Sequence, residues 1–168
     1  MYELGCLPRT IALKKMSNWY PFFSDLSAYC APGRVSHPIE AIRNIGWISN
    51  STNFTKSIKH PAEFLQKLKS LVQDRDLLVN KIRGYAPCEL CGYSRYEDST
   101  GLVLGNAELL LKGSAFLFCS PTLIIHYVEA HHYLPPSEFI DCVLSFNKDS
   151  EYRAEEIFKR EVSLSSLK

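Results

Sequence analysis

The chain has 168 residues and a mass of 19.1 kDa, the size of one ordinary domain with a buried core. Hydrophobic residues make up 46% and charged residues 22%, a composition that excludes an intrinsically disordered protein. The longest apolar runs are too short to span a membrane, and residues 1–16 lack the features of a signal peptide. We therefore expect a single domain over residues 1–168 and a cytoplasmic location.

The net charge of +1 conceals a difference between the two halves of the chain. Residues 1–87 contain 12 Lys and Arg against 6 Asp and Glu, whereas residues 88–168 contain 7 against 12. This division can produce one basic and one acidic face, which would select a partner by charge. The commoner alternative is that both sets of charges are dispersed over the solvated surface.

The first half of the chain predicts one clear helix. Residues 1–36 are aromatic-rich and irregular, because prolines and a glycine interrupt them. Residues 39–48 form a short apolar stretch typical of a strand or a short helix. Apolar residues at helical spacing then predict a helix from Pro61 to Gln73, which Asp74 to Asp76 separate from a further apolar segment at residues 77–82.

The second half predicts short strands followed by helices. Apolar runs at residues 102–104, 107–111 and 115–119 predict strands, the last two joined by a hairpin turn. Ser120 as N-cap and Pro121 as first helical residue predict a helix that ends near His131.

Two further segments have helical patterns. A helix begins at Pro136 or Ser137 and turns apolar residues inward: Phe139, Ile140, Val143, Leu144 and, as a further candidate, Phe146. The charged tail at residues 149–168 is a candidate for a last helix.

These elements predict an α+β fold, a small antiparallel sheet with packed helices. It includes an enlarged zinc-finger-like module at residues 85–132. The residues we expect in the core are Trp19, Phe22, Trp47, Phe64, Leu68, Ile124, Tyr127, Phe139 and Val143.

Four residues have the spacing of a zinc site. Cys88 and Cys91 form a Cys-x-x-Cys, and His126 and His131 follow after a gap of 34 residues. Two thiolates and two imidazoles fill the tetrahedron that Zn²⁺ prefers. The alternative is a reduced cysteine pair with surface histidines. The remaining cysteines are expected to be small buried hydrophobic residues: Cys6, Cys30, Cys119 and Cys142.

The spacing of the two histidines needs an irregular helix end. Residues five apart on a regular helix are rotated by about 500°, so that His126 and His131 would not share a face. A tightened or unwound last turn removes this difficulty. His132 is the alternative second histidine ligand, and we favour His131.

The chain resembles a family of small uncharacterised bacterial proteins through motifs spread over residues 20–145. The matching residues are Tyr20-Pro21-Phe22, Asp25-Leu26-Ser27, Ile45-Gly46-Trp47, Pro61 to Leu65, Cys88, Cys91, Gly92, Gly105, Glu108, His126-Tyr127, His131, Tyr133, Pro135-Pro136 and Phe139. The resemblance implies a zinc-binding fold, favours His131 over His132, and implies no established activity.

The candidate functions belong to three classes. A zinc hydrolase needs an open metal position and a base such as Glu89 or Glu129, but four good ligands close the site, so we expect no enzyme. The deaminase pattern is only half present, because no His-x-Glu precedes Pro87. We expect no specific DNA binding, since the predicted helix over residues 121–132 has no Lys or Arg.

A protein-binding function therefore leads. Small cytosolic bacterial proteins without enzymatic activity are often immunity proteins, and we expect a cognate toxin as the partner. The alternative is a zinc-containing regulator or a nucleic-acid-associated protein.

Overall fold

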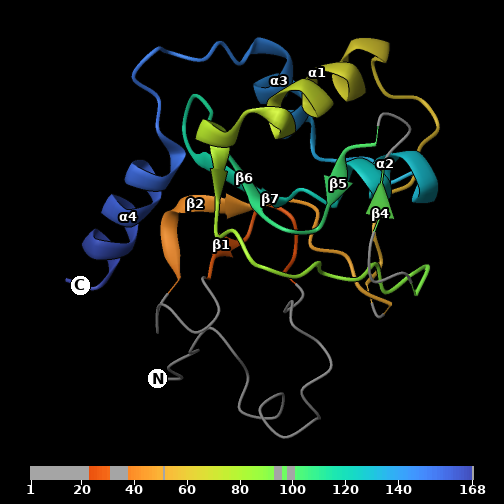
Figure 1. The fold of residues 1–168 in the computed structure, drawn as a ribbon, viewed down its shortest axis with the longest axis horizontal. Helices are drawn as coiled ribbons and strands as arrows, with labels where there is room; N and C mark the ends of the chain where they lie inside the picture. The colour runs from red at the N-terminus through yellow and green to blue at the C-terminus, as the bar shows by residue number, and fades with distance from the viewer. Residues whose placement is uncertain (1–22, 31–37, 51, 93–95, 98–100, 168) are drawn as a thin grey trace, which may run out of the picture.

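A five-stranded sheet lies at the centre of the computed structural model, with helices packed against it (Figure 1). The structure describes residues 23–30, 38–50, 52–92, 96–97 and 101–167. In sheet order the strands are β1 (Ala28–Tyr29), β2 (Ile39–Asn44), β7 (Leu117–Pro121), β6 (Glu108–Lys112) and β3 (Leu78–Val79). Neighbouring strands are antiparallel except β2 and β7, which are parallel.

The remaining elements are a two-stranded sheet and the helices. The small sheet pairs β4 (Tyr96–Glu97) with β5 (Val103–Leu104). The helices are α1 (Ala62–Gln73), the 3₁₀ helix η1 (Arg75–Leu77), α2 (Ile124–His131), α3 (Ser137–Ser145) and α4 (Ala154–Ser165). This arrangement confirms the predicted α+β fold, with one parallel pair in the sheet.

The central strands β6 and β7 are buried along nearly their whole length. Such strands read as continuous apolar runs, because both faces of the sheet are covered. Phe118 of β7 contacts Phe139 of α3, which contacts Phe64 of α1, with ring centroids 6.0 and 6.4 Å apart. Burying each such side chain contributes about 1.5–3 kcal/mol. These rings fix α1 and α3 on the sheet.

The helix α4 packs at the other end of the sheet, beside β2 and β3 (Figure 1). Its Phe158 is 2% exposed and meets Tyr29 of β1 edge to face, with ring centroids 5.7 Å apart. The Tyr29 hydroxyl donates a 2.6 Å hydrogen bond to Glu108, which is also buried. The charged tail thus contains a helix as predicted, and its apolar side holds it on the sheet.

The predicted start of α2 is wrong by three residues. Ser120 and Pro121 belong to β7, where they pair with Leu109 and Glu108 of β6. The ladder continues as the Thr122 N–H donates to the Ala107 carbonyl at 3.0 Å. This pairing holds the backbone extended, so the helix begins only at Ile124, and Ser120 is not its N-cap.

The other local predictions hold with small shifts. The helix α1 matches the segment predicted from Pro61, and residues 39–48 contain a strand, β2. The last predicted strand lies two residues later in the chain than expected. The helix α3 begins at Ser137, but Leu144 is 37% exposed, which contradicts its predicted inward orientation.

Most of the predicted core residues are buried. Those at or below 4% exposure are Trp47, Phe64, Leu68, Ile124, Tyr127, Phe139 and Val143. Trp19 and Phe22 lie outside the described residues. Among the scattered cysteines, Cys119 and Cys142 are buried free thiols as predicted. Cys30 is buried but disulfide-bonded, contrary to the prediction, and Cys6 lies outside the described residues.

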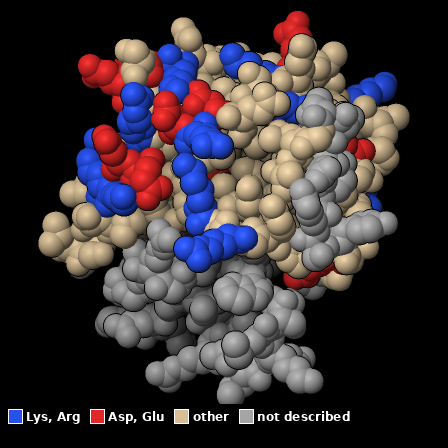
Figure 2. Space-filling view, viewed as in Figure 1, with Lys and Arg blue, Asp and Glu red and all other residues tan. Residues whose placement is uncertain are grey.

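Charges of both signs are mixed on the visible face around α4 (Figure 2). Lys148 binds Asp74 and Asp76, each at 2.8 Å, and Lys69 binds Glu129. These ion pairs join residues of the basic half to residues of the acidic half. The basic and the acidic half of the sequence therefore do not form separate basic and acidic surfaces on this face. Among the described helices, none is long and apolar enough to cross a membrane.

Candidate metal centre

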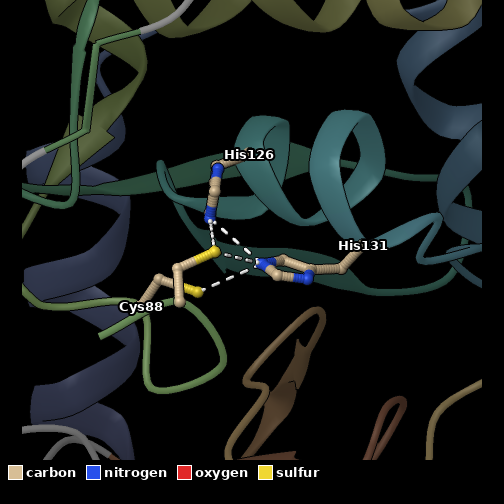
Figure 3. A group of neighbouring side chains, drawn as sticks. Cys88, His126 and His131 are labelled. Carbon is tan, nitrogen blue, oxygen red and sulfur yellow. Dashed lines mark hydrogen bonds between the residues drawn. The ribbon is translucent and has the colours of Figure 1, made fainter. Parts of the chain in front are cut away.

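Two distant parts of the chain bring four donor side chains together (Figure 3). Cys88 and Cys91 come from a turn that follows a loop, and His126 and His131 come from α2. Their ligand atoms all lie within 4.8 Å of one another. The four residues singled out from the sequence thus form one cluster that can hold a metal ion.

The separations between the donor atoms agree with a tetrahedral site. His131 Nε2 lies 3.0 Å from Cys91 Sγ and 3.4 Å from Cys88 Sγ, and His126 Nε2 lies 3.5 Å from Cys91 Sγ. The two Nε2 atoms are 3.2 Å apart. Ordinary Zn–S and Zn–N bonds in a tetrahedron give edges of about 3.6 Å between sulfur and nitrogen and about 3.3 Å between nitrogens. Three of the four separations lie close to these edges, and the distance between His131 Nε2 and Cys91 Sγ is shorter, so the donor set fits such an ion after a small movement of one side chain.

A tight turn positions the two thiols. The Gly92 N–H donates a 2.8 Å hydrogen bond to the Cys88 carbonyl, which closes the turn over both cysteines. Gly92 has a φ of +72°, a conformation that glycine adopts without the steric cost of a side chain. Cys88 is 1% exposed, whereas Cys91 is exposed, so the cluster lies at the edge of the core.

An irregular helix end places the two histidines. The backbone N–H of His132 bonds to the carbonyl of Tyr127, five residues back instead of four. This widened last turn turns His131 toward His126. His132 itself has a φ of +56°, in the left-handed region, and its exposed side chain is not in the cluster. The structure therefore groups His131, and not His132, with the cysteines.

Burial sets the protonation of the cluster. It lowers the pKa of His126 to about 4, with a smaller contribution from the neighbouring His131. Burial is also the main cause that lowers the pKa of His131, followed by the charges of Lys56 and His132. Neutral imidazoles are the form that binds metals. Burial raises the pKa of Cys88, so its thiol has to lose a proton when a metal binds.

Further residues anchor the two ligand-bearing segments. The Ala86 N–H donates to the Gly105 carbonyl at 2.6 Å, and the Gly105 N–H donates to Thr122 Oγ1 at 2.9 Å. These bonds tie the segment before Cys88 to the segment before α2. Gly105 is one of the residues on which the predicted family resemblance is based, but its partners could not be predicted from the sequence.

The carboxylates considered as catalytic bases have other partners. Glu89 Oε2 accepts a 3.2 Å hydrogen bond from the Asn50 N–H, and Glu129 forms the ion pair with Lys69. Neither carboxylate belongs to the four-residue cluster. Both therefore have a role in connecting segments of the fold.

The fold and the site define an α+β protein with a Cys₂His₂ cluster that can hold a metal ion. Residues 21–144 match a family described as Domain of unknown function (DUF7919), and the chain belongs to this family. The match is consistent with the predicted membership of an uncharacterised family. No curated protein and no solved structure matches the chain.

Proposed function

We propose that the cluster holds one Zn²⁺ ion, which stabilises the fold. The observation that carries this proposal is the convergence of Cys88, Cys91, His126 and His131 at tetrahedral separations. Sulfur and imidazole nitrogen are the donors of structural zinc sites. The ion would link the turn at Cys88 directly to α2, in addition to the hydrogen bonds of Gly105 with Ala86 and Thr122 that tie the segments before them.

The protein then acts by binding another protein and has no catalytic activity of its own. Four protein ligands fill a tetrahedral ion and leave no position for a reactive water. The two candidate bases, Glu89 and Glu129, are held by Asn50 and Lys69. The helix α2 contains no Lys or Arg, which argues against specific reading of DNA by this helix.

The partner we propose is a cognate toxin in the cytoplasm, which the protein neutralises by direct docking as an immunity protein. The support for this choice is the expected class of protein: a small protein that resembles uncharacterised bacterial ones and offers four protein ligands to a metal ion. The proposal requires one tight protein partner.

Metal analysis tests the first step. Protein purified without a metal-affinity tag is examined by native mass spectrometry and elemental analysis, beside Cys91→Ser. One zinc per wild-type chain, lost together with the folded state in the variant, is the expected result. Cys142→Ser makes the same atom exchange at a buried thiol outside the cluster and should retain zinc. A folded wild type without zinc would disprove the metal site, and a folded Cys91→Ser variant with exchangeable zinc would favour an open-site enzyme.

Capture from the native host tests the second step. The zinc-loaded protein is immobilised and the retained proteins are identified, with the chelator-treated protein as control. We expect one partner, retained at high salt and encoded beside this chain. If the folded, zinc-loaded protein retains no partner, the protein-binding function is wrong.

A further inference from the structure

A cleft of about 710 Å³ lies between the β6–β7 turn and the segment that joins α3 to α4. None of the four residues of the metal cluster lines it. Its apolar surface comes from aromatic residues of both sides, among them Phe118, Phe146 and Tyr152, which are at most 8% exposed. The size is in the usual range for binding sites, which is about 300–1,000 Å³.

The rim of the cleft carries an excess of negative charge. Four carboxylates line it, and the one basic side chain among its lining residues is Lys112. The four are Glu138, Asp141, Asp149 and Glu151, all exposed. Within the part of the chain that the structure describes, none of these carboxylates forms an ion pair. Lys148, which is adjacent in sequence to Asp149, is bound to Asp74 and Asp76.

An exposed aromatic ring extends the apolar surface to the rim. Phe116 lies in the β6–β7 turn and is 40% exposed. The Arg43 guanidinium lies 4.3 Å from the centre of its ring, so one face of the ring already contacts a cation of this chain. A basic side chain entering the cleft would find aromatic surface for its alkyl chain and carboxylates for its charged end.

We propose that this cleft is a docking site for a basic segment of a partner protein, one that alternates Lys or Arg with apolar residues. The inference rests on the proposed protein-binding function and assigns it a surface. Charge complementarity selects the occupant: the unpaired carboxylates favour a cation, and the aromatic floor favours one that carries hydrocarbon. A purely acidic or polar segment would leave both features of the cleft unused.

Binding of a defined peptide tests the chemistry of the cleft. The probe is a fluorescein-labelled peptide, Lys-Leu-Lys-Phe-Lys-Leu-Lys, added to the full chain loaded with zinc. We expect saturable binding that weakens with salt, with NMR shift changes at residues 114–118 and 146–152. A peptide with Glu in place of every Lys should not bind.

Charge neutralisation provides the matched comparison. Asp141→Asn combined with Glu151→Gln removes two rim charges, one from α3 and one from the segment that joins α3 to α4, and neither side chain makes a hydrogen bond within the described residues. We expect about three- to tenfold weaker peptide binding, since each exposed ion pair contributes little by itself. Glu63→Gln combined with Glu156→Gln removes two exposed charges outside the cleft and should leave binding unchanged.

The outcomes separate this proposal from the proposed function. Equal binding by the two double variants, or shift changes elsewhere, would overturn the docking site. Spermidine that competes as strongly as the peptide would overturn the docking site in favour of a small polyamine. A wild-type dimer that is lost in Asp141→Asn would overturn it in favour of a second copy of this chain.

If the captured partner binds the cleft variant as tightly as wild type, the docking site is wrong and the protein-binding function stands. If no partner is captured but the peptide binds as expected, the cation specificity of the cleft stands and the proposed function is wrong.

Discussion

The Tyr133 hydroxyl donates a 2.8 Å hydrogen bond to Asp25 Oδ2, joining the end of α2 to the segment before β1. The other oxygen of Asp25 accepts the Gly46 N–H at 2.8 Å. Tyr133 is fully buried and lies two residues beyond His131. The Asp25 carboxylate therefore fixes the position of the chain just after His131, where α2 ends.

Tyr133→Phe removes this bond and little else. We expect the free energy of unfolding to fall by about 1 kcal/mol, because the Asp25 carboxylate loses one of its donors, although Asp25 as a whole is exposed. Urea unfolding measures the change, and a double-mutant cycle with Asp25→Asn isolates the coupling between the two residues. Additive effects in that cycle would show that the bond contributes nothing to stability.

Stability should also depend on the ionisation of Asp25. Burial raises the pKa of this carboxyl above 3.8, although the hydrogen bonds from Gly46 and Tyr133 oppose the shift. The folded state therefore holds the proton more tightly than the unfolded state, so the contribution of Asp25 to stability falls as pH rises from about 4 through the folded pKa.

Comparing wild type with Asp25→Asn isolates this contribution, because the other titrating groups are the same in both. The unfolding free energy of wild type minus that of the variant should decrease across this pH window and level off above it. Urea titrations at closely spaced pH values measure the difference. A difference that increases with pH would mean that the folded state lowers the Asp25 pKa.

The sequence was sufficient to predict α1 and the four residues of the Cys₂His₂ cluster, since both depend on local spacing. In a Cys-x-x-Cys and in a later pair of histidines, the spacing that brings each pair of ligands together lies within a few residues of chain. The start of α2 could not be predicted in this way. Ser120 and Pro121 have the local signals of a helix start, and only their pairing with β6 overrides those signals.

Long-range relationships account for the remaining differences. The parallel pairing of β2 with β7 joins two strands that are far apart in sequence, with α1 and several strands between them along the chain. The bonds that Asp25 makes with Gly46 and Tyr133 likewise join residues far apart in the chain. A short sequence motif does not indicate which distant residues it contacts, so these bonds could not be predicted.

Gly105→Ala should destabilise the fold and loosen the metal site. Gly105 has a φ of +84°, and a Cβ there would lie 2.7 Å from the Ala86 carbonyl oxygen. Left-handed strain and a clash with backbone together should cost at least about 2 kcal/mol. Because Ala86 leads directly into the turn at Cys88, zinc affinity should also fall, as competition with a chromogenic chelator would show.

Two other glycines provide controls for Gly105. Gly101 has a φ of +80° with open space around it, so Gly101→Ala should show only the conformational strain, about 1 kcal/mol. Gly84 has neither a positive φ nor a neighbour within 4 Å, so Gly84→Ala should have little effect. Equal effects at Gly101 and Gly105 would show that the contact with Ala86 is unimportant.

Neighbouring histidines at the end of α2 should respond in opposite directions to substitution. His131→Ala removes a donor whose Nε2 lies 3.0 Å from Cys91 Sγ, so zinc binding and the stability it supplies should be lost. His132→Gly places glycine in a left-handed C-terminal position and should retain zinc while raising stability by about 0.5–1 kcal/mol.

Thermal unfolding with and without a chelator distinguishes the two effects. Chelation should lower the Tm of wild type and of His132→Gly. Adding Zn²⁺ back should restore both Tm values. His131→Ala should be insensitive to the chelator, because it has no bound metal to lose. Loss of zinc in His132→Gly with retention in His131→Ala would reverse the assignment, and would require a helix end different from the one in which the His132 N–H bonds to the Tyr127 carbonyl.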